Sequence, residues 1–491
     1  MAALASCGML GVSNNKRCQT RAQRSHPLGF MIRQVPLNAK LTDEDVLAAI
    51  ESAVPTQTVQ AVIADLGIAS RRQRKLPTEL VLLLTVAMSL FTRQSLRQVL
   101  VKMLKGLRFV WPEPSFVVAT KGAISQARYR LGARPVVELF RRVCQPLATT
   151  ATRGAFLFDR RLVAIDLTFE DLPDSPENSR AFGHHWSDRG PSAFPQMMVA
   201  YLVECGTHAI FDLGCWRCHA NQHAAAWRLL RSVKPGMLLL WDSGLHSFKM
   251  AAKTIARGAD FLGRLPTGPK FTPIQPRLSD GTVLAYLYPD RHSRPEHRQR
   301  LEVRIITYTF TDPNRPGSGK THRLMTSLLD AEAYSALDLI CAYHERWEVE
   351  LTIDELDTHQ RLLGHPLRSQ KLVGVIQELY GLAIAHHAIR RVMHDSALLQ
   401  DVDPDRLSFV NAFELIADAI PEFQMAASQE HSVLYQRLLR DIAQHLLPER
   451  ANRTNPRVVK RKMSKFNAKR PEHQHWPQPS KPFREAVAVL N

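Results

Sequence analysis

The sequence predicts a mixed α/β protein in which helical regions lie on either side of a strand-rich middle. Apolar residues repeat at helical spacing over residues 41–150 and again after residue 331. Between residues 151 and 330, short apolar runs bounded by turn-forming residues replace that pattern, which is typical of strands. A chain of 491 residues has room for two to four domains and a large core.

Composition points to a polyanionic partner. The chain has 64 Lys and Arg against 46 Asp and Glu, a formal charge of +18. The alternative partner is a membrane surface. However, the longest apolar run, residues 81–90, is shorter than the roughly 18 residues that a spanning helix needs. Seven scattered cysteines favour reduced thiols in the cytosol over a disulfide framework.

The N-terminal part divides into two regions. Residues 1–40 lack the basic start of a signal peptide, and we expect a disordered leader or a mis-assigned start there. Residues 41–150 are helical, with a capping-box-like start at Thr42, a basic cluster at 71–75 and two helices around Gly132. This region is either a DNA-binding domain or a helical bundle with solvated basic residues.

Residues 151–265 contain strands and helices in a recognisable order. Asp166 lies within a predicted strand, and Asp242 ends another. Three strands, a helix, a strand, a helix and a last strand follow one another, which is the order of a ribonuclease-H-like core. The predicted elements are strands 161–169, 194–204 and 208–216, helix 224–233, strand 236–241, a helix ending near Gly258, and strand 259–265.

The remaining regions are predicted from composition and periodicity. Residues 266–330 form an all-β insertion with a turn at Asp280-Gly281 and strands 283–287, 301–310 and 322–328. Residues 331–400 return to the core with two helices, the second at 372–393. Residues 401–491 are helical at 409–419 and 431–446 and then basic. That basic tail is either solvated or follows a phosphate backbone.

One helix, from Tyr343 to Gln360, carries the most informative pattern. Its carboxylates repel each other unless a cation lies among them. A divalent metal on Glu350 with phosphate on Tyr343 and Arg346 would relieve that repulsion; the simpler alternative is an exposed charged face. At about 100° per residue, the polar arc holds Tyr343, Arg346, Glu350, Asp354 and Asp357, and the apolar stripe holds Ala342, Val349, Ile353 and Leu356.

The spacing Tyr343-x2-Arg346-x3-Glu350 resembles the signature of the insertion-sequence-four family of bacterial cut-and-paste transposases. Residues 163–183 around Asp166 and residues 235–244 around Asp242 are similar to two further blocks of that family. The resemblance extends over about residues 40–470. It implies a DDE active site on a ribonuclease-H-like fold, a β insertion after the second Asp, and an N-terminal helical domain that binds the element's ends.

The resemblance also implies roles for single residues. Asp166, Asp242 and Glu350 would be catalytic and would bind two Mg²⁺ or Mn²⁺ ions, which suit carboxylate ligands. Tyr343 and Arg346 would grip the DNA phosphate, and Trp347 would stack on a displaced base. The structural alternatives are a core-edge aromatic for Tyr343, an i,i+4 partner of Glu350 for Arg346, and packing for Trp347.

The chain departs from the family signature at one position. The family has a Lys seven residues after the Glu, and this chain has Asp357. The change removes a cation that should contact DNA phosphate. Either Arg361 or Lys371 substitutes for it, or this copy is impaired.

The function predicted is that of a transposase. It would bind inverted-repeat ends as a homodimer on double-stranded DNA, cleave them, pass through a hairpin and join them to target DNA. It would act in the bacterial cytoplasm at the nucleoid. The alternatives are a structure-specific nuclease on the same core and a catalytically impaired DNA-binding relative.

Three other motifs carry no predicted function. Cys215-Trp216-Arg217-Cys218-His219, with His223 nearby, matches a haem-attachment or zinc pattern but lacks a loop to enclose a metal. Residues 316–321 resemble a phosphate loop but lack its leading Gly and lie between strands. His184-His185 are expected at the surface or facing DNA.

Overall fold

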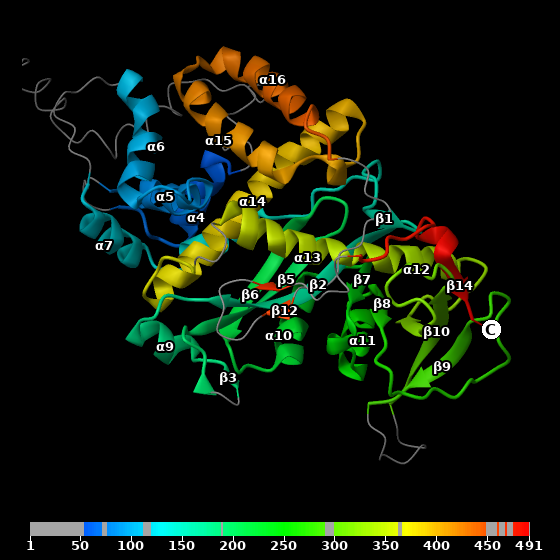
Figure 1. The fold of residues 1–491 in the computed structure, drawn as a ribbon. Helices are drawn as coiled ribbons and strands as arrows, with labels where there is room; N and C mark the ends of the chain where they lie inside the picture. The colour runs from blue at the N-terminus through cyan, green and yellow to red at the C-terminus, as the bar shows by residue number, and fades with distance from the viewer. Residues whose placement is uncertain are drawn as a thin grey trace, which may run out of the picture.

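The computed structural model describes residues 54–70, 76–110, 119–187, 190–289, 299–361, 366–447, 459–460, 467–468 and 475–490. Within these residues a mixed β-sheet is covered by helices on both faces (Figure 1). The predicted leader 1–40, the capping box at Thr42, the basic cluster 71–75 and most of the basic tail lie outside the described residues.

The sheet mixes parallel and antiparallel pairs. β2 pairs antiparallel with β5 and parallel with β7, and β7 is parallel to β8; the remaining pairs are antiparallel. β1 (Phe156–Leu157) pairs with β2, and β9 (Val283–Leu287) with β10. The main order is β14 (Val487–Val489), β10 (Leu301–Phe310), β11 (His322–Thr326), β8 (Asp260–Arg264), β7 (Met237–Trp241), β2 (Arg160–Asp171), β5 (Gln196–Glu204) and β6 (Ala209–Arg217).

The central strands are apolar because helices cover them on both sides. Every residue of β7 is buried, as expected for a parallel strand between two helical layers. Helices α10 (Gln222–Leu229) and α11 (Phe248–Ile255) lie on one face, and α14 (Leu372–Gln400) crosses the other (Figure 1). The predicted order of strands and helices over residues 151–265 is therefore present. Helix α9 (Pro176–Phe182) and the short pair β3 (Trp186–Ser187) and β4 (Gly190–Pro191) were not predicted.

The predicted β insertion is not a separate sheet. β11 pairs with β8, so the strands of residues 266–330 extend the central sheet. The turn at Asp280-Gly281 is present, with Gly281 at a φ of +82° that favours glycine. The C-terminal region also differs from the helical and basic region predicted, because β14 pairs with β10 at the sheet edge. Apolar periodicity could not reveal a strand of three residues.

The N-terminal helices share their core with the rest of the chain. The two predicted helices around Gly132 are α7 (Lys121–Leu131) and α8 (Arg134–Val143). α5 (Thr78–Leu90) packs on α14 so closely that a Cβ at Gly381 would lie 2.7 Å from the Thr85 carbonyl oxygen. Only glycine permits this approach. α4 (Thr56–Asp65) and α6 (Leu96–Val110) complete this group.

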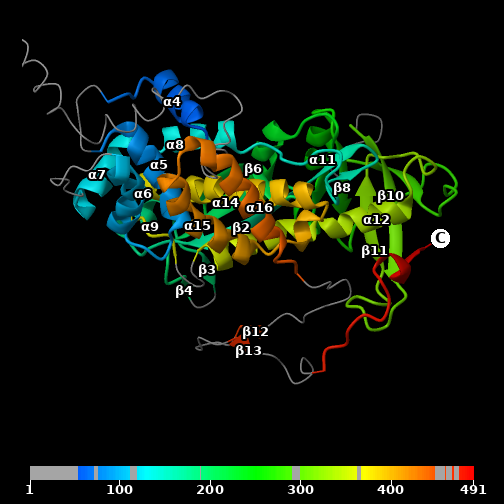
Figure 2. The ribbon, with the colours of Figure 1, turned by 90° about the horizontal axis from the view of Figure 1, so that it is seen from above.

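Helix α14 is a candidate membrane span by composition that the search for continuous apolar runs did not identify. Over 29 residues it is long and apolar enough to cross a membrane by composition alone. However, 83% of its most apolar window is buried inside the protein, as in the central helix of a folded core. α15 (Phe409–Met425) and α16 (His431–Ala443) cover its outer side (Figure 2).

The helix predicted from Tyr343 to Gln360 is broken into segments. α12 (Ala336–Glu345) and α13 (Trp347–Asp354) meet at Arg346, and the last turn, Glu355–Gln360, is a π-helix. A π turn is wider than an α turn, so the predicted angle of 100° per residue does not hold beyond Asp354. The apolar stripe is correct, since Ala342, Val349 and Leu356 are buried.

Candidate active site

Asp166 and Asp242 lie on neighbouring parallel strands. The register of β2 and β7 pairs Ala164 with Leu240. Asp166 and Asp242 each follow these residues by two, so they are level with each other and point to the same face of the sheet. Adjacent strands are about 4.8 Å apart, which places the two carboxylates side by side.

Glu350 reaches the same place from helix α13 through Arg346. The Arg346 Nη2 donates to Glu350 Oε1 at 2.8 Å, and its Nη1 lies 3.6 Å from Asp166 Oδ2. One guanidinium therefore contacts an acid from the sheet and an acid from the helix. The break between α12 and α13 falls at Arg346 itself, where the side chain leaves the helix junction toward the sheet.

The charges of the three acids act on one another. The pKa of Asp166 is raised to about 6, chiefly by burial, with contributions from the carboxylates of Asp242 and Glu350. The Leu167 N–H, which donates to Asp166 Oδ1 at 2.7 Å, and the Arg346 guanidinium oppose this rise. The structure thus brings together the three acids singled out from the sequence.

Asp242 is oriented by the turn that follows it. Its Oδ1 accepts hydrogen bonds from the N–H groups of Gly244 and Leu245, at 3.0 and 3.2 Å. These bonds cap the short helix η2 (Ser243–Leu245) and fix the carboxylate at the end of β7. A Cβ at Gly244 would lie 3.3 Å from both oxygens, so a glycine there keeps space around them.

Tyr343 lies beside the site but is engaged with the protein. Its hydroxyl donates to the carbonyl oxygen of Trp241 at 3.3 Å, which ties α12 to the residue before Asp242. Burial raises its pKa, so the phenol stays protonated. The hydroxyl hydrogen is used in this bond, and contact of Tyr343 with phosphate stays a prediction.

Arg346 and Trp347 have groups available to a partner. The Arg346 Nε and Nη1 are buried and have no hydrogen-bond partner among the described residues. Trp347 is 50% exposed, which disfavours the packing role considered from the sequence. Donor atoms of this kind suit a phosphate, and an exposed indole suits stacking on a base.

The donor set fits a hard divalent cation. It consists of carboxylate oxygens, which Mg²⁺ and Mn²⁺ prefer and which need no His or Cys cage. Because three acids face one guanidinium here, the site has an excess of negative charge, and after burial the charges of Asp242 and Glu350 contribute to the raised pKa of Asp166.

Asp357 belongs to a second charged cluster along β2. Arg361 donates to Asp357 Oδ1 at 3.0 Å and also contacts Glu170, whose side chain is 4% exposed. Burial, followed by the charge of Glu170, raises the pKa of Asp357 to about 8. Glu170 and Asp166 lie four residues apart on one strand and share a face. That even spacing was visible in the sequence but was not used.

The two residues predicted to substitute for the missing Lys, Arg361 and Lys371, lie in different surroundings. Arg361 lies directly beside Asp357. Lys371 instead lies 5.3 Å from the centre of the Tyr129 ring on helix α7, so it is engaged with the N-terminal helices. Of the two, only Arg361 is placed where a cation could replace the family's Lys.

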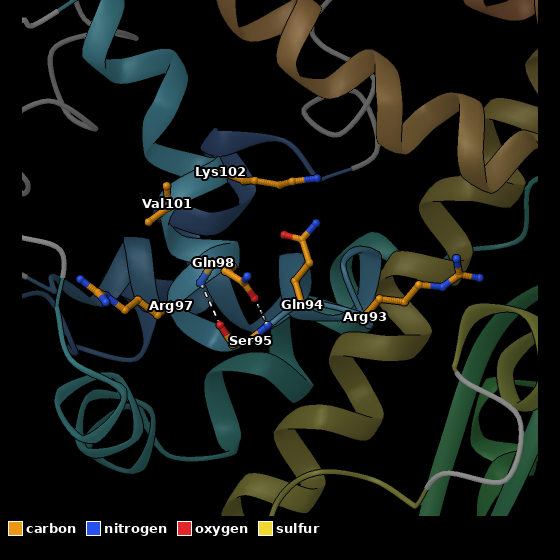
Figure 3. Close-up of a pocket in the computed structure, with 7 residues that line it drawn as sticks. All are labelled: Arg93, Gln94, Ser95, Arg97, Gln98, Val101 and Lys102. Carbon is orange, nitrogen blue, oxygen red and sulfur yellow. Dashed lines mark hydrogen bonds between the residues drawn. The ribbon is translucent and has the colours of Figure 1, made fainter.

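A basic hollow lies at the turn between α5 and α6 (Figure 3). Ser95 and Gln98 exchange reciprocal hydrogen bonds of 2.8 and 3.3 Å, which form a capping box at the start of α6. Long cationic side chains surround this helix start. The hollow is lined by Arg93, Gln94, Ser95, Arg97, Gln98, Val101 and Lys102.

Part of the first-Asp block has a structural role. Ser175 caps α9 and donates to the Gln370 carbonyl oxygen at 2.8 Å. The Asn178 amide donates to the carbonyl oxygens of Pro173 and Ser369, both at 3.1 Å. These residues anchor the chain after β2 to the segment before α14.

The structure shows where the three motifs without a predicted function lie. In the part of the chain described, Cys215, Cys218 and His219 belong to no group of three or more close metal ligands, and the five described cysteines are free. Residues 316–321 connect β10 and β11 as a hairpin loop. His184 has partners within the protein, the Ser192 carbonyl oxygen at 2.8 Å and the Ser179 hydroxyl at 3.1 Å.

Comparison with known proteins identifies relatives over most of the chain. The family description "Insertion element 4 transposase N-terminal" matches residues 44–141, and "Transposase DDE domain" matches residues 157–387. The chain is 27% identical over 434 residues to transposase InsG for insertion sequence element IS4 of Escherichia coli (strain K12), covering 86% of this chain and 93% of that protein.

Two further proteins are similar. Putative transposase InsZ of the same organism is 26% identical over 274 residues, which cover 54% of this chain and 86% of InsZ. Among solved structures, the piggyBac transposase in a cryo-EM synaptic complex with hairpin DNA matches with a TM-score of 0.42 and 11% identity, over 82% of this chain and 85% of that one.

Proposed function

The chain belongs to the insertion-sequence-four family of DDE transposases, and on this premise we propose that Asp166, Asp242 and Glu350 are its three catalytic acids. The observation that carries this proposal is the convergence of Asp166 and Glu350 on Arg346, with Asp242 beside Asp166. The Arg346 guanidinium contacts Glu350 and Asp166, and Asp242 is level with Asp166 on the neighbouring strand.

The topology supports a ribonuclease-H-like core for these acids. Strands β6, β5 and β2 are antiparallel neighbours, and β2, β7 and β8 are parallel neighbours. The first acid lies on the central strand of this set and the second at the end of the strand beside it. Rigid elements on both sides therefore hold the site.

Asp166, Asp242 and Glu350 would hold two Mg²⁺ or Mn²⁺ ions. When bound, the ions stabilise charge on the attacking and leaving oxygens of the phosphodiester. Arg346 would bind a phosphate of the cleaved end through Nε, which has no hydrogen-bond partner in the described part of the chain, and through Nη1, which lies 3.6 Å from Asp166. Tyr343 would hold the end of β7, and so Asp242, in place. Trp347, being half exposed, would stack on a displaced base.

DNA would be held by the helical N-terminal region and by basic segments. The hollow at the start of α6 presents Arg93, Arg97 and Lys102 to a phosphate backbone. Excision needs two paired ends, so we expect a homodimer in the complex with DNA. The proposed sequence is hydrolysis at the end, attack of the freed 3′-hydroxyl on the opposite strand to give a hairpin, reopening and strand transfer. The setting would be the bacterial cytoplasm, at the nucleoid.

A catalytically impaired relative is the second candidate because Asp357 replaces a Lys. The raised pKa of Asp357 weakens this alternative, since a carboxyl with a pKa of about 8 is mostly uncharged at neutral pH. At pH 7 the replacement of Lys by Asp357 would then remove a positive charge without adding a negative one. We therefore favour an active enzyme.

The test uses DNA from either side of the coding region. Short inverted repeats there would supply the ends, to be incubated with the full chain, Mg²⁺ and a target plasmid. We expect cleaved ends and joined products, and the loss of both in Asp166→Asn and Glu350→Gln with end binding kept. Asp171→Asn, on the same strand but outside the site, is the matched control. Cuts without joined products would favour the nuclease, and binding without cuts would favour the impaired relative.

A further inference from the structure

Helix α13 carries a second group of charged side chains on the side away from Glu350. Glu348, two residues before Glu350, faces the turn between β5 and β6, where His208 lies. Asp405, in the short helix η5 (Pro404–Arg406), approaches from the segment after α14. Three segments that are distant in sequence thus place a His and two carboxylates together.

The ligand atoms of these residues converge. His208 Nε2 lies 3.2 Å from Asp405 Oδ1 and 3.8 Å from Glu348 Oε2. One ligand atom from each residue lies within 4.8 Å of the other two. In a tetrahedral zinc site with bonds of about 2.0–2.1 Å, neighbouring ligands are about 3.3–3.4 Å apart. The distance from His208 to Asp405 matches this value, and Glu348 would need to approach by a few tenths of an ångström or more.

Several of these atoms are buried without a hydrogen bond. The side chains of His208 and Glu348 are 4% and 5% exposed. His208 Nε2, Glu348 Oε1 and Asp405 Oδ1 have no hydrogen-bond partner within the described part of the chain. Buried polar atoms are almost always paired, so this group requires an explanation.

The other ring nitrogen of His208 contacts a carboxylate, as is common for metal-ligating histidines. His208 Nδ1 lies 3.0 Å from Glu355 Oε1 and also contacts Arg390 Nη2. In the tautomer with its proton on Nδ1, His208 donates to Glu355 and the lone pair of Nε2 points toward Glu348 and Asp405, and binding of a metal at Nε2 requires this tautomer. Figure 1 shows α13 and α14 on the same side of the sheet.

The balance of charge also favours a cation. Among the described residues, five carboxylates interact electrostatically in this cluster, against one permanent cation, Arg390, and the titratable His208 and His386. The carboxylates are Glu345, Glu348, Glu355, Asp403 and Asp405.

We propose that His208, Glu348 and Asp405 bind one divalent transition-metal cation such as Zn²⁺. One imidazole and two carboxylates suit a borderline ion better than Mg²⁺. The site is structural. It fixes α13 to the β5–β6 turn and to the segment after α14, and so fixes the backbone from which Glu350 projects. Gly206, in that turn, donates its N–H to Glu348 Oε2, and Oε1 of the same carboxylate has no hydrogen-bond partner among the described residues.

The conformation of His208 agrees with this role. His208 has a φ of +56°, in the left-handed region that few residues other than Gly adopt. Its imidazole is almost fully buried. A metal–nitrogen bond would compensate for such a conformation.

The experiment separates this ion from ions at the proposed active site. The full-length chain carrying Asp166→Asn and Asp242→Asn is treated with EDTA, incubated with Zn²⁺, desalted and analysed by mass spectrometry for metal content. We expect one Zn²⁺ per chain and a thermal midpoint raised by the ion. Adding His208→Asn, which tolerates positive φ, should lower Zn²⁺ affinity at least tenfold and abolish the thermal shift. His219→Asn, the same change at an exposed His, should alter neither.

Three results would overturn the proposal. The chain with both active-site changes could retain no Zn²⁺, His208→Asn could retain a full equivalent, or His219→Asn could lose as much as His208→Asn, which indicates adventitious surface binding only. Asp405→Asn provides a second variant at a more exposed ligand and decides the matter if His208→Asn does not fold. None of these readouts depends on DNA cleavage, so failure here leaves the proposed transposase chemistry untouched.

Discussion

Arg346 donates a hydrogen bond of 2.8 Å from Nη2 to Oε1 of Glu350, four residues further along the chain. The same guanidinium lies 3.6 Å from Asp166 through Nη1. The arginine thus offsets the repulsion between two acids that come from different elements. It also keeps buried N–H groups available for an incoming phosphate.

We expect that a lysine cannot perform the role of Arg346. In Arg346→Lys, a single ammonium cannot contact Glu350 and Asp166 at once while also binding a phosphate bidentately. We expect the rate of end cleavage to fall about 100-fold, a size typical of losing one positioned donor. End binding, measured by gel shift, should change by less than threefold.

The matched control for this change is Arg228→Lys on the exposed side of α10, which should retain full cleavage. Cleavage within a factor of three of wild type in Arg346→Lys would show that the guanidinium does not act at the reacting phosphate.

Asp166 should lower the stability of the metal-free protein. Its pKa is raised to about 6, above the ordinary value of 3.8, so the folded state binds the extra proton between about pH 4 and pH 6. Stability therefore falls as the pH rises through this window, and the cost, about 1–3 kcal/mol, persists at pH 7. Asp166→Asn removes it.

The measurement is thermal unfolding in EDTA. At pH 7.5 we expect Asp166→Asn to unfold about 1–3 °C above wild type, and the difference to shrink at pH 4. Mg²⁺ should raise the midpoint of wild type and not of the variant. Asp171→Asn should show no such dependence. If wild type were the more stable protein at pH 7.5 without metal, the carboxylates would not be crowded as described.

The three acids were singled out by the resemblance to the transposase family, because an Asp in a strand or at its end and a Glu on an amphipathic helix are common patterns. The structure brings them near one another, and the parallel pairing of β2 with β7 accounts for the approach of Asp166 and Asp242. Contacts between distant residues had no such pattern. Neither the contact of Arg361 with Glu170 nor that of His208 with Glu348 can be read from periodicity.

Two further features escaped prediction for physical reasons. The π turn after Asp354 changes the angular spacing of Asp357, and such turns have no strong sequence signal. Glu348 and Glu355 lie seven residues apart, beside Val349 and Leu356 on the buried stripe. This spacing places both charged residues on the buried side of the helix, and it is the feature of the sequence that indicated a buried polar network.

The basic hollow should contribute to DNA affinity through charge. Arg93→Gln and Arg97→Gln each remove a cation from the start of α6. If each contacts one phosphate, the slope of log affinity against log salt should fall by about 0.9 per change, with little dependence on DNA sequence. Fluorescence anisotropy with the element's end and with unrelated duplex would measure this.

Lys253→Gln is the control, since Lys253 is exposed on α11, and α11 lies far from α5 and α6 in Figure 1. An unchanged salt slope in the double variant would exclude the hollow from the DNA interface.

Asp357 should behave as a neutral residue at pH 7 and as an anion above pH 8. Its pKa is raised to about 8, chiefly by burial and then by the charge of Glu170. Ionisation above that pH adds a negative charge beside Arg361 and, in our proposal, near a DNA phosphate. At solvated distances of about 4 Å such a charge costs about 1 kcal/mol, roughly a fivefold effect.

We therefore expect Asp357→Asn to cleave ends at the wild-type rate at pH 7 and about fivefold faster than wild type at pH 9, because only wild type acquires the charge. Asp418→Asn, at an exposed position on α15, should follow wild type at both pH values. Asp357→Lys restores the family's cation and should strengthen end binding at either pH. A fivefold gap already present at pH 7 would mean that Asp357 is ionised there, and the impaired relative would become the better description of this chain.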